Sequence, residues 1–190
     1  MPLALPQPQK SFRPPSAPVG RVDRRLARPQ PHPSGKLRLN VQPTHVDEVI
    51  RHVLQTVGAE LHEKQLRVEQ EFAATDDRVD GDPARLQQTL WDLLSNALKF
   101  TPRGGRVEVL LQQVNSHVEI SVIDTGEGIT REFLPHVFDR FRQADATTTR
   151  RHGGLGLGLS IVKQLIELHG RSVRVKSAGV GARPSPYRSF

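Results

Sequence analysis

Three polar residues recur at helical spacing in a stretch that is otherwise typical of an apolar helix: Asp92, Asn96 and Lys99. At positions i, i+4 and i+7 they share one helix face, opposite a row of leucines. A carboxamide oxygen is a good ligand for a hard cation such as Mg²⁺, and a lysine one turn away can neutralise phosphate charge. This face therefore indicates either a cation and phosphate site or an ordinary solvated helix surface.

A second candidate lies between residues 152 and 170, where glycines at alternate positions run into an apolar helical pattern. Glycines let backbone N–H groups approach a ligand, and a helix N-terminus adds unpaired donors and partial positive charge. The stretch is typical of a phosphate cradle, although a flexible loop before a core helix has the same pattern. Its alternating residues are Gly154, Leu155, Gly156, Leu157 and Gly158.

The third candidate is the motif DTGEGI at residues 124–129, which directly follows an apolar strand pattern. Asp124 at a strand end could accept a hydrogen bond from an exocyclic amine. Gly126 and Gly128 would let a flat ring lie against the backbone. The alternative interpretation is a tight turn closed by an Asx interaction.

Periodicity predicts the elements that must position these residues. Asp82 and Pro83 form an N-cap and first-turn signal for the helix that carries Asn96, and Thr44 or Asp47 is the expected cap of an earlier helix. Expected helices cover 47–63, 83–100, a short stretch near 131–137 and 159–168. Expected strands cover 36–41, 66–72, 107–114, 118–124 and 172–177, with turns at 76–82 and 115–116.

Composition narrows the function classes. The net charge is +7, but the basic residues concentrate at the two ends and the centre is mildly acidic, which argues against a nucleic-acid-binding face. The chain has no cysteine, no membrane-length apolar run and no signal-peptide core, so we expect a cytoplasmic protein. Most of its 15 prolines fall within residues 1–35, which we expect to be disordered.

Four motifs in order carry a resemblance: NALKFTPRGG, DTGEGI, FDRFRQAD and GGLGLGL. From about Gly35 to Gly181 the chain resembles the ATP-binding catalytic domain of bacterial sensor histidine kinases, within the superfamily shared with gyrase, Hsp90 and mismatch-repair ATPases. The resemblance implies an α+β fold of the Bergerat type. This is a two-layer α/β sandwich, in which a mixed, mostly antiparallel sheet carries helices on one face.

The resemblance also implies roles for individual residues. Asn96 would coordinate Mg²⁺, Lys99 would contact phosphate, and Asp124 would read the adenine amino group above a floor shaped by Gly126 and Gly128. Further residues implied are the lid anchors Phe138 and Phe141, the lid itself at 147–151, and the triphosphate-wrapping segment Gly154, Leu155, Gly156, Leu157 and Gly158. The implied cofactors are ATP and Mg²⁺.

Asp92 departs from the family, which usually has asparagine there. In gyrase-like relatives a glutamate at this position activates water. Asp92 could therefore be a shorter general base, or it could hold Mg²⁺ through water; we favour the magnesium role.

The two ends depart further. The helical hairpin that dimerises such kinases and bears their substrate histidine is missing upstream, and His62-Glu63, the one His-Glu pair, is expected to be a surface dipeptide. At 183–190 two prolines replace the family's closing strand. Codons allowed for residues 22–32 and 182–190, read in shifted frames, can spell LIDDLLDLSRI and ATFTVPLV, and we hypothesise frameshifts at both ends.

These observations give our expectations for the whole chain. We expect a Pro/Arg-rich segment at 1–35, an ATPase domain at 36–182 and an aberrant tail at 183–190. The first function is phosphoryl transfer from Mg-ATP to a histidine on a separate dimerisation domain, with a response regulator downstream. The alternatives are an inactive nucleotide-binding or regulatory module and a stand-alone ATPase. We expect a monomer of marginal stability.

Overall fold

The computed structural model describes residues 38–143 and 155–179. Expectations for the segment 1–35, for Gly154, for the lid at 147–151 and for the tail at 183–190 lie outside these residues. The elements are β1 (Gln42–His45), α1 (Val46–Glu63), β2 (Arg67–Phe72), β3 (Arg78–Gly81), α2 (Pro83–Phe100), β4 (Arg106–Val114), β5 (His117–Asp124), the 3₁₀ helix η1 (Leu134–His136) and α4 (Gly158–Leu168).

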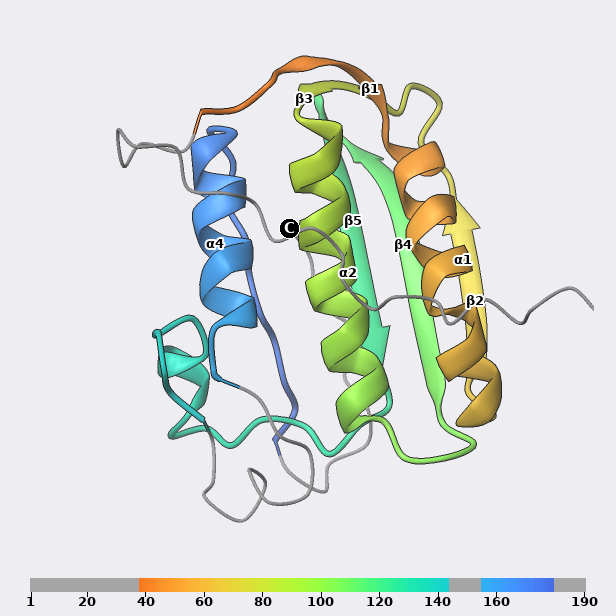
Figure 1. Cartoon of the computed structure of the whole chain (residues 1–190), viewed down its shortest axis with the longest axis vertical. Helices are drawn as coiled ribbons and strands as arrows, with labels where there is room; N and C mark the ends of the chain where they lie inside the picture. The colour runs from red at the N-terminus through yellow and green to blue at the C-terminus, as the bar shows by residue number, and fades with distance from the viewer. Residues whose placement is uncertain (1–37, 144–154, 180–190) are drawn as a thin grey trace, which may run out of the picture. The chain divides into compact units, whose positions relative to one another are not determined.

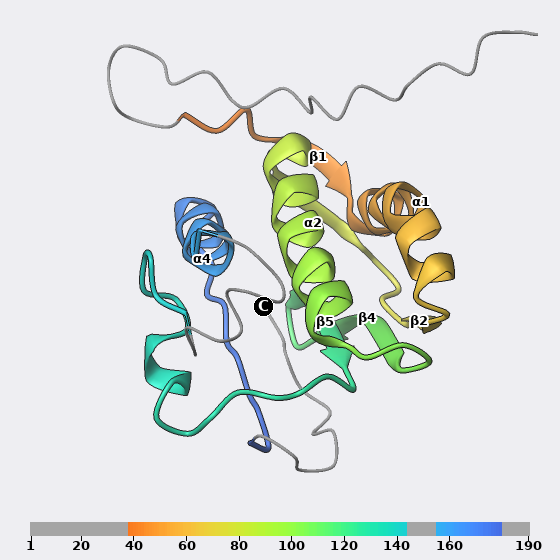
Figure 2. The same ribbon diagram turned by 60° about the horizontal axis from the view of Figure 1, so that its bottom comes forward.

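The described part of the chain forms two layers, with α1, α2 and α4 covering one face of the sheet (Figures 1 and 2). The main sheet has the order β2-β4-β5, with β2 parallel to β4 and β4 antiparallel to β5, and β1 pairs with β3 in an antiparallel ribbon. The core lies between the layers and includes Ile50, Leu94, Val109, Val122 and Val162. The expected α+β sandwich with helices on one face is confirmed.

Helix α2, which carries the first candidate face, is stabilised at both ends. Its N-cap Asp82 accepts hydrogen bonds from the N–H groups of Ala84 and Arg85, as the sequence predicts. At its C-terminus the ammonium group of Lys64, just beyond α1, donates to the carbonyl oxygens of Leu98, Lys99 and Thr101. A cation at this end interacts favourably with the helix dipole. The same hydrogen bonds join the end of α1 to the end of α2, next to Lys99 of the candidate face.

The expected strand 36–41 is wrong for its described part, since residues 38–41 form no strand and β1 begins only at Gln42. Part of the turn-rich stretch 76–82 is instead β3. Strand β1 was not predicted because it contains Pro43. Proline is accepted in an edge strand, and β1 lies at an edge. The pairing of β1 with β3 joins residues more than thirty positions apart, such as Pro43 and Asp80, which local periodicity cannot detect.

The expected strand 172–177 also does not form a ladder within the described residues, and the short helix near 131–137 shrinks to η1. The segment 171–179 runs as an extended trace after α4 (Figure 1). It is held partly by side chains, because Val173 packs against the core and the hydroxyl of Ser177 accepts a hydrogen bond from the N–H of Ile129 at 2.8 Å. Strand hydrogen bonds need a partner strand, and none of the described strands supplies one here.

None of the helices in the described residues is both long and apolar enough to cross a bilayer.

Candidate functional site

The face of α2 that carries Asp92, Asn96 and Lys99 is half-buried, so it is not simply a solvated helix surface. Burial raises the pKa of Asp92 to about 7, and burial lowers the pKa of Lys99. The Oδ2 atom of Asp92 is buried without a hydrogen-bond partner among the described residues. A buried carboxylate oxygen of this kind favours either a bound cation or a proton, so the donor set fits Mg²⁺.

The N-terminus of α4 lies against this face. A Cβ atom placed on Gly158, the first residue of α4, would stand 3.7 Å from the side-chain nitrogen of Asn96. In the described residues no side chain caps this helix end, and its first turn carries no acidic residue. The N–H donors of this first turn and the helix dipole therefore favour an anion beside Asn96.

The end of β5 reaches the C-terminus of α2, at the same end of the domain as the N-terminus of α4 (Figure 1). The Oδ1 atom of Asp124 accepts a hydrogen bond from the N–H of Gly126 at 2.9 Å, which is the Asx turn of the alternative interpretation. Gly126 is required for packing, because a Cβ there would lie 2.7 Å from the carbonyl oxygen of Phe100. The adenine contact of Asp124 stays a prediction.

Two of the remaining predicted residues are glycines that adopt a left-handed backbone conformation. Gly128 and Gly156 both have positive φ, at 79° and 66°, where L side chains are strained. A Cβ on Gly156 would lie 2.7 Å from the carbonyl oxygen of Arg142, and its own carbonyl accepts from the N–H of Phe141. The stretch that contains the FDRFRQAD motif is thereby joined to the glycine stretch by backbone contacts.

The two predicted lid anchors differ in their packing. Phe138 is half-buried, with the Lys163 ammonium 5.8 Å from its ring centroid, whereas Phe141 is 73% exposed at a positive φ of 61°. Leu155 is also exposed and Leu157 is half-buried. The structure therefore places Gly158 beside Asn96, on the face of α2 that also carries Asp92, and leaves the side chain of Phe141 largely in solvent.

Two contributors to the site could not be recognised from residue types. The carbonyl oxygen of Phe100 accepts from the N–H of Glu127 at 3.3 Å and fixes the turn after β5. Ser177 holds the same turn through Ile129. A backbone carbonyl carries no sequence signal, and the contact of Ser177 joins residues 48 positions apart.

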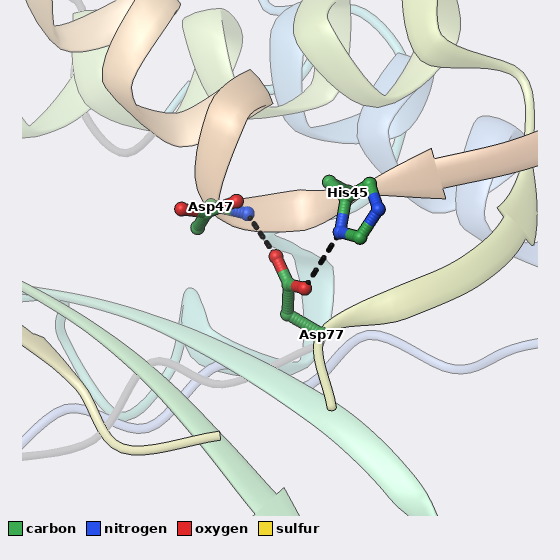
Figure 3. A group of neighbouring side chains, drawn as sticks. All are labelled: His45, Asp47 and Asp77. Carbon is green, nitrogen blue, oxygen red and sulfur yellow. Dashed lines mark hydrogen bonds and ion pairs between the residues drawn. The ribbon is translucent and has the colours of Figure 1, made fainter. Parts of the chain in front are cut away.

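A second polar cluster lies at the N-terminal end of α1. His45, Asp47 and Asp77 place one ligating atom each within 4.8 Å of one another (Figure 3). Both carboxylate oxygens of Asp77 are already hydrogen-bonded, Oδ1 to the ring of His45 at 3.0 Å and Oδ2 to the backbone N–H of Asp47 at 2.9 Å. Burial alone would raise the pKa of Asp77, but the hydrogen bonds from Asp47 and His45 outweigh it and lower that pKa to about 2.

This cluster is therefore the cap of α1. The expected caps were Thr44 or Asp47, and this prediction is wrong, because the N-cap is His45 and its side chain caps no helical N–H. Asp77, thirty residues further on, accepts the N–H of Asp47 through its side chain and the N–H of Val46 through its carbonyl. The hydrogen bond with Asp77 raises the pKa of His45.

Comparison with known proteins identifies the family of this chain. The profile described as histidine kinase-, DNA gyrase B- and HSP90-like ATPase matches residues 81–185. The chain is 37% identical over 146 residues to the circadian input-output histidine kinase CikA of Synechococcus elongatus, covering 76% of this chain and 19% of that kinase. The chain thus spans about a fifth of that relative.

Solved structures give the same result. The mycobacterial sensor histidine kinase MprB superposes with a TM-score of 0.64 at 33% identity, covering 78% of this chain and 93% of the MprB chain. Full-length ShkA, solved in complex with AMPPNP, superposes with a TM-score of 0.65 at 28% identity, covering 81% of this chain and 30% of ShkA.

Proposed function

This chain belongs to the family of histidine kinase-, DNA gyrase B- and HSP90-like ATPases, and we propose that it is the catalytic part of a sensor histidine kinase. In this proposal it binds Mg-ATP and presents the γ-phosphate to a histidine on a separate dimerisation domain. A response regulator then receives the phosphoryl group. A cytoplasmic location belongs to the same proposal, because that is where ATP is available.

One observation supports the proposal most strongly. The N-terminus of α4, which no side chain of the described residues caps, lies beside Asn96, on the face of α2 that also carries Asp92 and Lys99. Phosphoryl transfer requires mainly positioning and charge neutralisation. The N–H groups at Gly158 would bind phosphate oxygens, and Lys99 would add positive charge. Asn96 and Asp92 would hold the Mg²⁺ ion, which supplies neutralisation of charge on the phosphate oxygens when bound.

Calorimetric titration of the 190-residue chain with Mg-AMPPNP tests this proposal. We expect saturable binding, and the variant Asn96→Ala should bind at least about tenfold more weakly, because a ligand of the cation is removed. Gln55→Ala, which removes an exposed amide from α1, is the matched control and should bind as the unmodified chain does. Absence of binding by the unmodified chain would leave the regulatory module as the remaining function.

Two further assays separate the enzymatic alternatives. Labelled phosphate should move from ATP to a histidine when a dimerisation domain is added, as the kinase requires. ATP turnover without any histidine acceptor would instead indicate a stand-alone ATPase. In the latter case Asp92→Asn decides whether Asp92 is the base, because unchanged or higher turnover by this variant rules that role out.

A further inference from the structure

His169, at the C-terminal end of α4, makes a hydrogen bond at each ring nitrogen. Its Nδ1 atom lies 2.7 Å from the carbonyl oxygen of Leu165, and its Nε2 atom lies 3.0 Å from the backbone nitrogen of Asp82. A carbonyl oxygen can only accept and a backbone N–H can only donate. In this arrangement Nδ1 donates to Leu165 and Nε2 accepts from the N–H of Asp82.

The backbone of His169 is held in place by the end of α4. Gly170 has a φ of 71° and donates to the carbonyl of Glu167 at 2.9 Å, while Arg171 donates to the carbonyl of Ile166 at 3.1 Å. This is the Schellman pattern, in which a left-handed residue closes the last turn of a helix. These hydrogen bonds fix the backbone of His169 and therefore the position from which its side chain extends.

The other partner of the ring is equally well held. Asp82 is buried and caps α2, and its Oδ2 atom also accepts from the N–H of Asn40 at 2.9 Å. The ring lies close to the backbone of Gly81, since a Cβ there would be in ordinary contact with it, 3.6 Å from Cδ2 of His169. The imidazole therefore joins the C-terminus of α4 to the buried N-terminus of α2.

The consequence appears at the other end of α4. Helices α2 and α4 run in opposite directions (Figure 1). His169 at the end of α4 therefore lies at the start of α2, and Gly158 at the start of α4 lies beside Asn96, near the end of α2. Because α4 is a single helix of 11 residues, a contact that fixes one of its ends also fixes the position of the other end. We propose that His169 is a positioning residue, which fixes α4 along α2 and thereby holds the phosphate-binding N-terminus of α4 beside Asn96.

This inference rests on the proposed function for its effect on the nucleotide and on the fold for its geometry. Two variants separate the two hydrogen bonds of the ring. His169→Gln can place a side-chain oxygen near the Nε2 position and keep the acceptor for Asp82. His169→Asn can place its amide near the Nδ1 position, where it reaches only Leu165 of its own helix.

The test uses the 190-residue chain and two readouts. Without nucleotide, His169→Asn should speed hydrogen exchange of the Asp82 amide and shift the NMR resonances of the Gly158 amide and the Asn96 side chain. With Mg-AMPPNP, calorimetry should show about tenfold weaker binding for His169→Asn and a change of less than about threefold for His169→Gln. His62→Asn and His62→Gln, at an exposed position near the end of α1, are the matched controls and should alter neither readout.

The proposal is overturned if His169→Asn leaves the Gly158 and Asn96 resonances unchanged, or if both variants bind the nucleotide equally. If the unmodified chain binds no nucleotide, the proposed function fails and the role in nucleotide positioning fails with it. The resonances of the nucleotide-free chain then still decide whether His169 sets the position of α4.

Discussion

Asp92 is the acidic residue on the candidate-site face of α2. Its side chain is half-buried, its Oδ2 atom has no hydrogen-bond partner among the described residues, and burial raises its pKa to about 7. An ionised carboxylate in this position is costly unless a cation compensates it. Asp92 is therefore expected to couple the stability of the domain to pH and, as the proposed Mg²⁺ ligand, to magnesium.

The pH dependence of stability follows from the direction of this shift. The unfolded chain loses the Asp92 proton near pH 3.8 and the folded chain loses it near pH 7, so the free energy of unfolding decreases between these values. Without Mg²⁺ and nucleotide, Asp92→Asn should be more stable than the unmodified chain by about 2 kcal/mol at pH 8, allowing for partial exposure of the side chain. At pH 4 the difference should nearly vanish.

Denaturant unfolding at the two pH values measures this difference. Asp80→Asn is the control, since Asp80 is an exposed residue of β3. A stability difference between Asp92→Asn and the unmodified chain that is the same at pH 4 and pH 8 would contradict the assignment of a desolvated carboxyl group.

At the scale of single elements, α1 shows how an end can depend on distant residues. Its first turn is capped by Asp77 from the connection between β2 and β3, rather than by a residue of its own sequence neighbourhood. Asp77 also holds His45 at the end of β1. One carboxylate therefore ties β1 and α1 to the start of β3.

Removing this cap should loosen all three elements. We expect Asp77→Ala to lower the free energy of unfolding by about 1 kcal/mol at pH 7, as the loss of a helix cap does. Because hydrogen bonding lowers the pKa of Asp77 from 3.8 to about 2, its contribution is present above pH 4 and is lost as pH falls toward 2. Thermal melts of Asp77→Ala and of the exposed control Asp80→Ala across pH 2–7 measure it. An advantage of the unmodified chain that persists unchanged at pH 2 is incompatible with this cap.

The elements that the sequence predicted are those specified by local pattern. Helices α1 and α2 and the β4–β5 hairpin formed within a residue or so of their expected bounds, because periodicity, the Asp82 cap and the Asn115 turn are all local signals. Strands β1 and β3 were missed, because each is short and depends on the other.

At the scale of the whole molecule, not every extended segment of the described residues joins the sheet. β5 lies at one edge of the order β2-β4-β5 formed by the described strands, and 171–179 forms no ladder with them. Extended segments without strand partners open easily. Stability is therefore expected to be concentrated in α1, α2 and β4.

Native-state hydrogen exchange can map this distribution. We expect amides of β4, such as those of Val109 and Leu111, to exchange slowly, because β4 is paired on both sides and its apolar side chains are buried. Amides of residues 172–177 should exchange at least about a hundredfold faster. Equal protection of the two segments would mean that 172–177 belongs to the sheet.

The expectation of a monomer of marginal stability remains a prediction at this scale. Analytical ultracentrifugation and a thermal melt of the 190-residue chain test it, and a sharp cooperative melt of a monomer would contradict marginal stability. The frameshift hypothesis for both ends also remains a prediction. The nucleotide sequence tests it, because absence of the shifted reading frames would exclude it.

The sequence alone determined the helical layer, the hairpin and the order of the polar motifs, because helix caps, glycine turns and side-chain periodicity act over a few residues. It also placed Asp92, Asn96 and Lys99 on one face of α2. Tertiary structure alone decided that the start of α4 lies beside Asn96, that Asp77 caps α1 and that His169 holds Asp82. These contacts join residues between 30 and 87 positions apart, and only packing of the helices on the sheet brings such residues together.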